Sequence, residues 1–196
     1  MTKRRSLLCL LALCGVLALS ACGSSPRHNY YLLNPGTDAA TGGDAPSLGV
    51  GPVTIPEYLA RENLVYKQHG NSLLVSDNDH WAEPLTDGIA RVVALNLSGL
   101  LQTQNVRTFP WHIQRQPELG VKISVLSLDA SDTEATLVAE WLLYRPGSAA
   151  PVERRMAQLQ YPLAEGTPAG EAVAQAYSAL LMELSRTIAD AVSARS

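Results

Sequence analysis

Two stretches of the chain carry apolar residues at the spacing of an amphipathic helix. The first runs from Glu83 to Gln102 and the second from near Thr167 to about Ser193. In each, apolar residues recur three and four positions apart, which places them on one helical face. The positions in the first are Leu85, Ile89, Val92, Val93, Leu97, Leu100 and Leu101. Those in the second are Val173, Tyr177, Leu180, Leu184, Ile188 and Ala191.

Shorter stretches alternate apolar and polar residues, as half-buried strands do. The clearest are Gly120–Leu128, Glu134–Tyr144 and Val152–Tyr161, with a Pro-Gly turn between the last two. Neighbouring strands joined by short turns predict an antiparallel meander. Further strands are predicted over Tyr30–Leu33, Leu48–Val53, Asn63–Gln68, Ser72–Ser76 and Val106–Phe109, with a short helical turn or bend over Pro56–Ala60.

These elements predict one α/β domain of α+β character. Its mixed, largely antiparallel sheet would pack with the two long helices, because each element has one apolar face to bury. The stretch from Asn34 to Ser47 is rich in Gly, Asp, Ala and Pro and has almost nothing to bury. We expect it to form a flexible loop between strands.

The N-terminal pattern differs from the rest of the chain and predicts an export signal. Lys3, Arg4 and Arg5 precede an apolar run, Leu7–Leu19, that is too short to span a bilayer. The run ends in small residues that lead into Cys22, which is the pattern of a lipoprotein signal peptide. The predicted organisation is therefore a signal over residues 1–21, a lipidated cysteine and tether over 22–28, and a domain over 29–196.

Removal of the signal changes the cysteine count and the charge. Cys9 and Cys14 lie within it, so Cys22 is the one cysteine of the predicted mature chain, and no internal disulfide or thiolate metal site is available. The signal carries only basic charges, so the remainder is more acidic than the net charge of −3 of the whole chain. An acidic domain argues against nucleic acid as a partner and against broad electrostatic binding to anionic lipid as the main function.

Cys22 is the most informative single residue. In a lipoprotein its thiol carries diacylglycerol and its new amino group is acylated, and several buried chains anchor far more firmly than one. Gly23 follows Cys22, where an Asp commonly retains lipoproteins in the inner membrane. We therefore expect an outer-membrane anchor with the domain on the periplasmic face. The alternative is an ordinary secretory signal with Cys22 as a chance thiol.

The candidates for chemistry are few, and no enzyme is predicted. Ser76 to His80 is the densest polar cluster, which suits either a metal or acid–base site or, as we favour, capping of the following helix. The histidines are scattered without paired spacing, and catalytic motifs such as GxSxG or a P-loop are missing. No cofactor is expected beyond the covalent lipid on Cys22.

Four features, in order, resemble the ABC-type transport auxiliary lipoproteins. They are the cysteine at the end of the signal, the segment Tyr30–Leu33 (YYLL), the segment Val50–Leu59 (VGPVTIPEYL) and the segment Trp81–Leu85 (WAEPL). Two departures stand beside them. The family often continues with Asp-Arg-Pro-Gln where this chain has Ala60–Asn63, and it often has Arg where this chain has His80.

The resemblance implies a non-enzymatic envelope protein with a mixed α/β fold. Similar lipoproteins are anchored in the outer membrane as partners of MCE-domain proteins, which form lipid tunnels between the membranes, and of inner-membrane transporter subunits. A ring of identical subunits is one arrangement the resemblance implies. A transport auxiliary of this kind would support envelope integrity.

We predict that partner contacts lie in the two segments that carry the resemblance. The candidate residues are Pro52, Ile55, Pro56, Tyr58, Leu59, Trp81, Glu83 and Pro84. The alternative to partner contact, which we weigh at least equally, is that the prolines and Trp81 are structural. The prolines would fix the ends of elements, and Trp81 would pack over the start of a helix. A different class of function also stays open, namely a stand-alone lipid- or glycan-binding lipoprotein that acts in envelope assembly.

Overall fold

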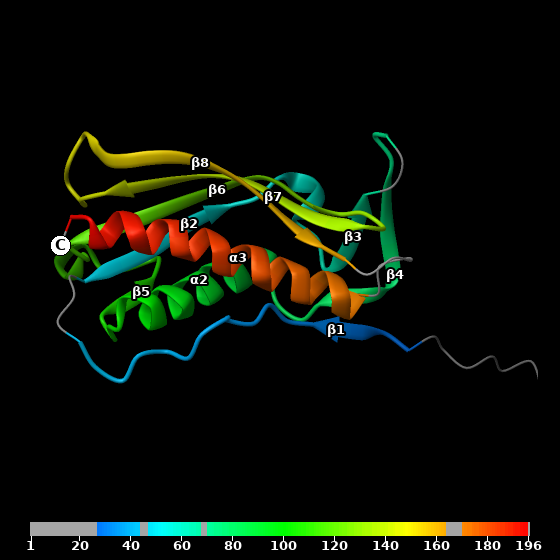
Figure 1. Ribbon diagram of the computed structural model, residues 1–196, viewed down its shortest axis with the longest axis horizontal. Helices are drawn as coiled ribbons and strands as arrows, with labels where there is room; N and C mark the ends of the chain where they lie inside the picture. The colour runs from blue at the N-terminus through cyan, green and yellow to red at the C-terminus, as the bar shows by residue number, and fades with distance from the viewer. Residues whose placement is uncertain (1–26, 44–46, 68–69, 164–169, 196) are drawn as a thin grey trace, which may run out of the picture.

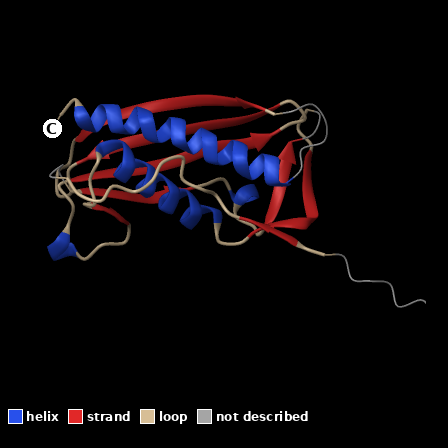
Figure 2. Ribbon diagram, turned by 60° about the horizontal axis from the view of Figure 1, so that its bottom comes forward, coloured by secondary structure: helices blue, strands red, loops and turns tan. Residues whose placement is uncertain are grey.

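A computed structural model of the chain describes residues 27–43, 47–67, 70–163 and 170–195. The predicted signal and Cys22 lie outside the described residues. The described part forms one α/β domain in which two helices cover one face of a sheet (Figures 1 and 2). This confirms the predicted fold class, with one refinement. The strands divide between a five-stranded and a three-stranded sheet, both mixed.

The larger sheet has the strand order β5-β2-β6-β7-β8. Its strands are β2 (Leu48–Thr54), β5 (Val106–Thr108), β6 (Leu119–Ala130), β7 (Glu134–Tyr144) and β8 (Pro151–Pro162). The strands β6, β7 and β8 form the predicted antiparallel meander, whereas β5, β2 and β6 run parallel. The parallel pairings are possible because α2 (Leu85–Leu101) lies between β2 and β5 in sequence and packs against both.

The alternation that predicted β6 and β7 is visible in their burial. Each residue that the pattern assigned to the core is almost fully buried: Val121, Ile123, Val125, Leu137, Ala139, Trp141 and Leu143. The alternation in β6 is interrupted where the register with β7 shifts between Val125 and Ser127. The extra residue, Leu126, is thereby exposed, and Leu128 takes the next core position.

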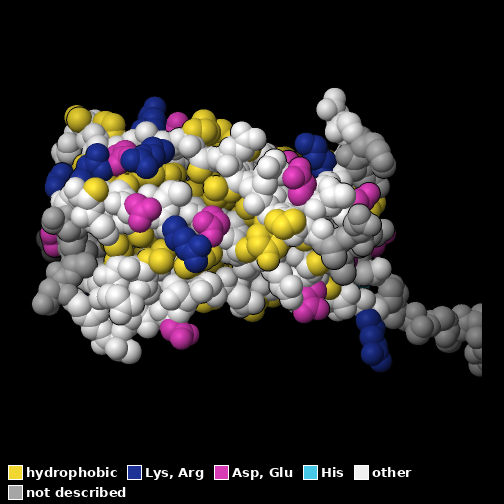
Figure 3. Space-filling model, in the orientation of Figure 1, with side chains coloured by type: hydrophobic (Ala, Val, Ile, Leu, Met, Phe, Trp, Pro, Cys, Tyr) yellow, Lys and Arg dark blue, Asp and Glu magenta, His cyan; other side chains and the backbone are white. Residues whose placement is uncertain are grey.

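The two helices form a single layer over the sheet. α3 (Gly170–Ser193) packs on α2 and against β7 and β8, and its predicted apolar face is buried. The residues predicted before Gly170, from 167 on, lie outside the described part. In Figure 3, which views the molecule from the direction of Figure 1, charges of both signs are interspersed. None of the described helices is long and apolar enough to cross a membrane.

The smaller sheet has the order β1-β4-β3 and corrects one sequence expectation. It contains β1 (Asn29–Tyr31), β3 (Asn63–Lys67) and β4 (Leu73–Trp81), with the short 3-10 helix η1 (Glu57–Leu59) before β3. The residues Asp77 to Asp79, expected to cap the helix, are strand residues of β4. The N-cap of α2 is Pro84, and no side chain bonds to the helix start. The capping prediction was therefore wrong.

The stretch after β1, expected to be a flexible loop, is held to α2 by hydrogen bonds. Gly36 N donates to Asn96 Oδ1 at 2.8 Å, and Ala40 N donates to Ser98 Oγ at 3.3 Å. Asn96 is fully buried, so this polar residue of α2 has a structural role in holding the segment. These hydrogen bonds hold the stretch in place, although it has few apolar side chains to bury. Its residues 44–46 lie outside the described part.

Candidate functional site

A pocket of about 400 Å³ lies where the two sheets meet the start of α2. Its walls come from β1, the segment after β2, the exit of η1, the end of β4 and the first turn of α2. The lining residues are Tyr30, Ile55, Ala60, Arg61, Glu62, Trp81, Ala82, Glu83, Pro84, Leu85 and Thr86. The two segments that carry the family resemblance thus meet here, although Ile55 and Trp81 are 26 positions apart in sequence.

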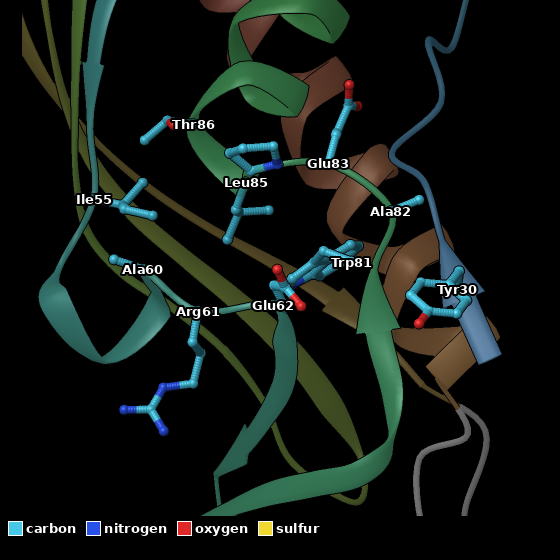
Figure 4. Close-up of a pocket in the computed structure, with 11 residues that line it drawn as sticks. Tyr30, Ile55, Ala60, Arg61, Glu62, Trp81, Ala82, Glu83, Leu85 and Thr86 are labelled. Carbon is cyan, nitrogen blue, oxygen red and sulfur yellow. The ribbon is translucent and has the colours of Figure 1, made fainter. Parts of the chain in front are cut away.

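The floor of the pocket is apolar and fixed. In Figure 4, the side chains of Ile55 and Leu85 point toward one another, with Trp81 beside them. Trp81 is only 6% exposed, and its ring stacks on Tyr177 of α3 with centroids 6.0 Å apart. Its backbone N–H donates to Glu62 O at 2.6 Å, which joins the end of β4 to the residues after η1. The floor is therefore part of the core and rigid.

One wall is held by an ion pair. Arg91 Nη2 contacts Glu83 Oε1 at 2.5 Å and donates to Leu33 O at 2.9 Å. Arg91 therefore links the start of α2 to the chain after β1. Glu83 is turned toward this partner and away from the centre of the pocket (Figure 4). The guanidinium of Arg91 neutralises the carboxylate of Glu83, so this half-buried wall of the pocket carries no net charge from the pair.

The rim is polar, aromatic and open to solvent. Tyr30 is 65% exposed, and its ring stacks on His80 with centroids 5.5 Å apart. His80 Nε2 lies 3.0 Å from His28 Nδ1, so one of these rings donates and the other accepts. Arg61 projects from the opposite side, away from the floor (Figure 4). The rim thus offers ring faces and a cation around an apolar centre.

The half-buried carboxylate of Asp79 holds the strands next to the pocket together. Asp79 Oδ1 accepts from Asn29 Nδ2 at 3.0 Å and Tyr31 OH at 3.2 Å, and Oδ2 accepts from Tyr66 OH at 3.2 Å and Ser76 Oγ at 3.0 Å. Burial raises the pKa of Asp79, but the hydrogen bonds outweigh it and the net pKa lies below its usual value. Burial and the adjacent carboxylate raise the pKa of Tyr66.

Four of the eight residues predicted for partner contact line the pocket. Ile55, Trp81, Glu83 and Pro84 are brought together there, whereas Pro52, Pro56, Tyr58 and Leu59 are not among its lining residues. These four lie at different depths. Pro52 is exposed on β2, Pro56 is half-buried before η1, Leu59 is 3% exposed in the core, and Tyr58 is half-buried.

Tyr58 has structural partners of its own. Its hydroxyl donates to Asp129 Oδ1 at 3.0 Å and accepts from Leu128 N at 3.4 Å, both in β6. Burial, together with the hydrogen bond and charge of Asp129, raises the pKa of Tyr58 to about 12. The tyrosine therefore fixes η1 against the larger sheet, which sets the position of the pocket residues Ala60 and Arg61 beside it.

Sequence reasoning missed several lining residues. Ala60, Arg61 and Glu62 fall in the stretch where this chain departs from the usual pattern of the family, and Ala82 lies between two predicted residues. The pairing of His28 with His80, 52 positions apart, had no sequence signal. Ala60, Arg61 and Glu62 were missed because exposed small and charged residues carry no periodic pattern that predicts their position.

The arrangement is suited to binding. Among the residues that the structure describes, no three His, Cys, Asp or Glu side chains gather to hold a metal ion. The pocket combines a rigid apolar floor with a polar rim, which is the anatomy of a site that receives an apolar side chain of a partner.

Comparison with known proteins supports a specific family. The sequence model described as ABC-type transport auxiliary lipoprotein component matches residues 30–189. The chain is 29% identical over 141 residues to the intermembrane transport lipoprotein PqiC of Escherichia coli strain K12, a match that covers 67% of this chain and 71% of that protein. PqiC of Shigella flexneri matches to the same extent.

Solved structures support the fold. Protein XCC0632 from Xanthomonas campestris superposes with a TM-score of 0.67 at 15% identity, covering 82% of this chain and 92% of that chain. A second crystal structure, of an uncharacterized protein, has a TM-score of 0.64 at 21% identity and covers 84% of this chain and 97% of the other. At such identities the likeness shows the fold alone.

Proposed function

The chain belongs to the ABC-type transport auxiliary lipoprotein family, and we propose that it is the outer-membrane-anchored auxiliary subunit of an MCE-type intermembrane lipid transport system. In this proposal the protein is non-catalytic and supports envelope integrity by docking. Cys22 carries the lipid anchor, and the domain faces the periplasm. Inner-membrane transporter subunits complete the system, and identical copies of this chain form a ring.

The observation that carries the proposal is the meeting of the two family segments in one pocket. Ile55 comes from the first segment, and Trp81, Glu83 and Pro84 come from the second. The pocket has a rigid floor and an open rim, so binding of a partner requires little reorganisation free energy. We propose these four residues as the partner contact.

The position of the pocket agrees with a partner that arrives at the outer membrane. Tyr30 lines the pocket and lies eight positions after Cys22. A fully extended chain of that length spans at most about 28 Å. A protein docked in the pocket would therefore lie close to the membrane that holds the anchor, where the periplasmic end of a tunnel between the membranes would arrive.

Cross-linking and affinity purification of the full-length protein from the envelope tests this function. Two variants add a long charged side chain at exposed positions that line the pocket, Ala60→Arg and Ala82→Arg. Ala150→Arg is a control at an exposed position in the turn before β8. We expect the wild type and Ala150→Arg to recover an MCE-domain or ABC-transporter subunit. The pocket variants should recover at least tenfold less. Recovery of neither partner by the wild type would overturn the proposal.

The alternative function is a stand-alone lipid-binding lipoprotein, and the apolar floor of the same pocket is the observation that favours it. A bound lipid would place its chain over Ile55, Trp81 and Leu85. Native mass spectrometry of the purified protein separates the two functions. One lipid bound per chain, lost in Ala60→Arg and kept in Ala150→Arg, would favour the alternative, and a lipid-free protein supports docking.

A further inference from the structure

The described part contains one run of three consecutive exposed large apolar residues. Leu73, Leu74 and Val75 are 42%, 44% and 37% exposed. They lie at the start of β4, in the hairpin that β4 forms with β3, and we call them the hairpin tip. Consecutive strand residues point to opposite faces, so the tip is apolar on both sides. Scattered exposed apolar residues are ordinary, but a continuous run marks an interaction surface.

We propose that the hairpin tip inserts into the lipid surface that holds the Cys22 anchor and so orients the domain on the membrane. This inference rests on the anchor in the proposed function and adds a second membrane contact to it. The occupant is the hydrocarbon boundary of the bilayer, into which aliphatic side chains enter readily.

The place of the tip in the fold supports this occupant. Figure 1 shows the β3–β4 hairpin and the beginning of β1 at the same end of the molecule, opposite the C-terminus. The strand β1 pairs in parallel with the end of β4, with Asn29 opposite Asp79. The anchored segment therefore enters the fold beside the strand that carries the tip.

The lengths involved allow both contacts at once. The chain between Cys22 and Asn29 spans at most about 25 Å when extended. The six residue steps from Asp79 back to Leu73 span at most about 20 Å of strand. A membrane that holds the lipid on Cys22 is therefore within reach of the tip without any change in the fold.

The charges near the tip also fit a lipid surface. Lys67 is exposed and lies opposite Leu73 in the register of β3 and β4. A lysine beside inserted apolar residues keeps its amine at the headgroups while its methylenes follow the apolar side chains. The nearest acidic residue along β4 is Asp77, two positions beyond Val75 and farther from the tip.

A fluorophore placed at the tip of the full-length lipidated protein tests the proposal. The predicted mature chain has no thiol besides the lipidated Cys22, so Leu74→Cys labels at one site with an environment-sensitive dye. Ile113→Cys is the control, because Ile113 is 77% exposed and lies far from the hairpin in sequence and fold. The labelled proteins are reconstituted into phosphatidylethanolamine–phosphatidylglycerol vesicles. Nitroxide-bearing lipid and aqueous iodide are compared as quenchers.

The expected result is that lipid nitroxide quenches the dye at position 74 at least threefold more than the dye at 113, while iodide shows the reverse order. Replacement of the flanking residues by Leu73→Ser and Val75→Ser should lower the lipid quenching at position 74 to the control level. Protein that floats with the vesicles but shows equal quenching at both positions overturns this inference alone. Protection from iodide without lipid quenching also overturns it, since a neighbouring protein then covers the tip. Protein that fails to float overturns the anchor as well.

Discussion

Asp79 illustrates how single polar residues hold this fold together. Its carboxylate receives four side-chain hydrogen bonds from β1, β3 and β4. Because its folded pKa lies below that of the unfolded chain, the ionised form stabilises the protein above about pH 4. That contribution is lost as the pH falls through the folded pKa. The junction of β1 with the domain is therefore sensitive to acid.

The variant Asp79→Asn removes this charge and keeps the size of the side chain. We expect the free energy of unfolding to fall by about 2 kcal/mol at neutral pH, the scale of hydrogen bonds to a charged group. We also expect the stability of the variant to change less than that of the wild type between pH 5 and pH 2. Denaturant titrations across this range measure both effects. Equal pH profiles for the two proteins would contradict the assignment.

Tyr58 makes a second prediction at the scale of one residue. Tyr58→Phe removes the hydroxyl that bridges η1 to Asp129 and Leu128. We expect a loss of about 1 to 2 kcal/mol in stability, because the two hydrogen bonds of the hydroxyl are removed while the ring still packs. Chemical denaturation measures the change. Affinity purification with the Tyr58→Phe variant should still recover the partner. Loss of the partner would indicate that the Tyr58 hydroxyl contacts it directly.

At the scale of elements, the sequence predicts those strands and helices whose burial follows a period. β6, β7, α2 and α3 have clear periods, and the structure confirms them. β7 has its predicted bounds, those of β6 and α2 differ from the prediction by one or two residues, and α3 ends at the predicted Ser193. β4 has no such period, because Ser76 to Asp79 are all polar. Its strand conformation depends on partners in β1 and β3 that no local pattern encodes. The polar run was therefore mistaken for a helix cap.

The segment after β1 shows the same limit and gives a prediction. Its composition predicts flexibility, but Asn96 and Ser98 of α2 hold it by hydrogen bonds. Asn96→Ala removes the bond to Gly36 N and a buried contact with Ser185 Oγ. We expect a loss of about 2 kcal/mol and faster amide exchange at Gly36. Unchanged exchange at Gly36 would show that other contacts hold the segment.

A close approach of backbones gives a further prediction at this scale. A Cβ on Gly99 would lie 2.4 Å from Asp38 O, so α2 and the segment after β1 cannot both keep their places in Gly99→Ala. We expect a loss of about 2 kcal/mol from this overpacking. Thermal unfolding measures it. Gly147→Ala is unsuitable as a control because its φ is +86°, whereas Gly42→Ala meets open space and should be nearly neutral.

For the whole molecule, the sequence predicted the class of fold but not its division into two sheets. The pairing of β1 with β4 joins residues 50 positions apart, and such contacts leave no local signal. The same pairing brings Tyr30 of β1 to the pocket beside Trp81 at the end of β4. The structure shows that four of the eight residues line one pocket, and their contact with a partner stays a prediction.

In the proposed function, one end of the molecule faces the partners. The start of β1, the hairpin tip and the pocket lining residue Tyr30 all belong to the small sheet or the strands that build it. The helical layer and the remainder of the large sheet support this end. An anchored lipoprotein built in this way would present its pocket close to the outer membrane.

Photo-cross-linking from the pocket in living cells tests the central claim most directly. A benzoyl-phenylalanine at position 60 lies on the exposed rim, and the same residue at position 150 is the matched control. The account predicts an adduct with an MCE-domain protein from position 60 and none from position 150. Identical adducts from both positions, or no MCE-domain adduct from position 60, would contradict it.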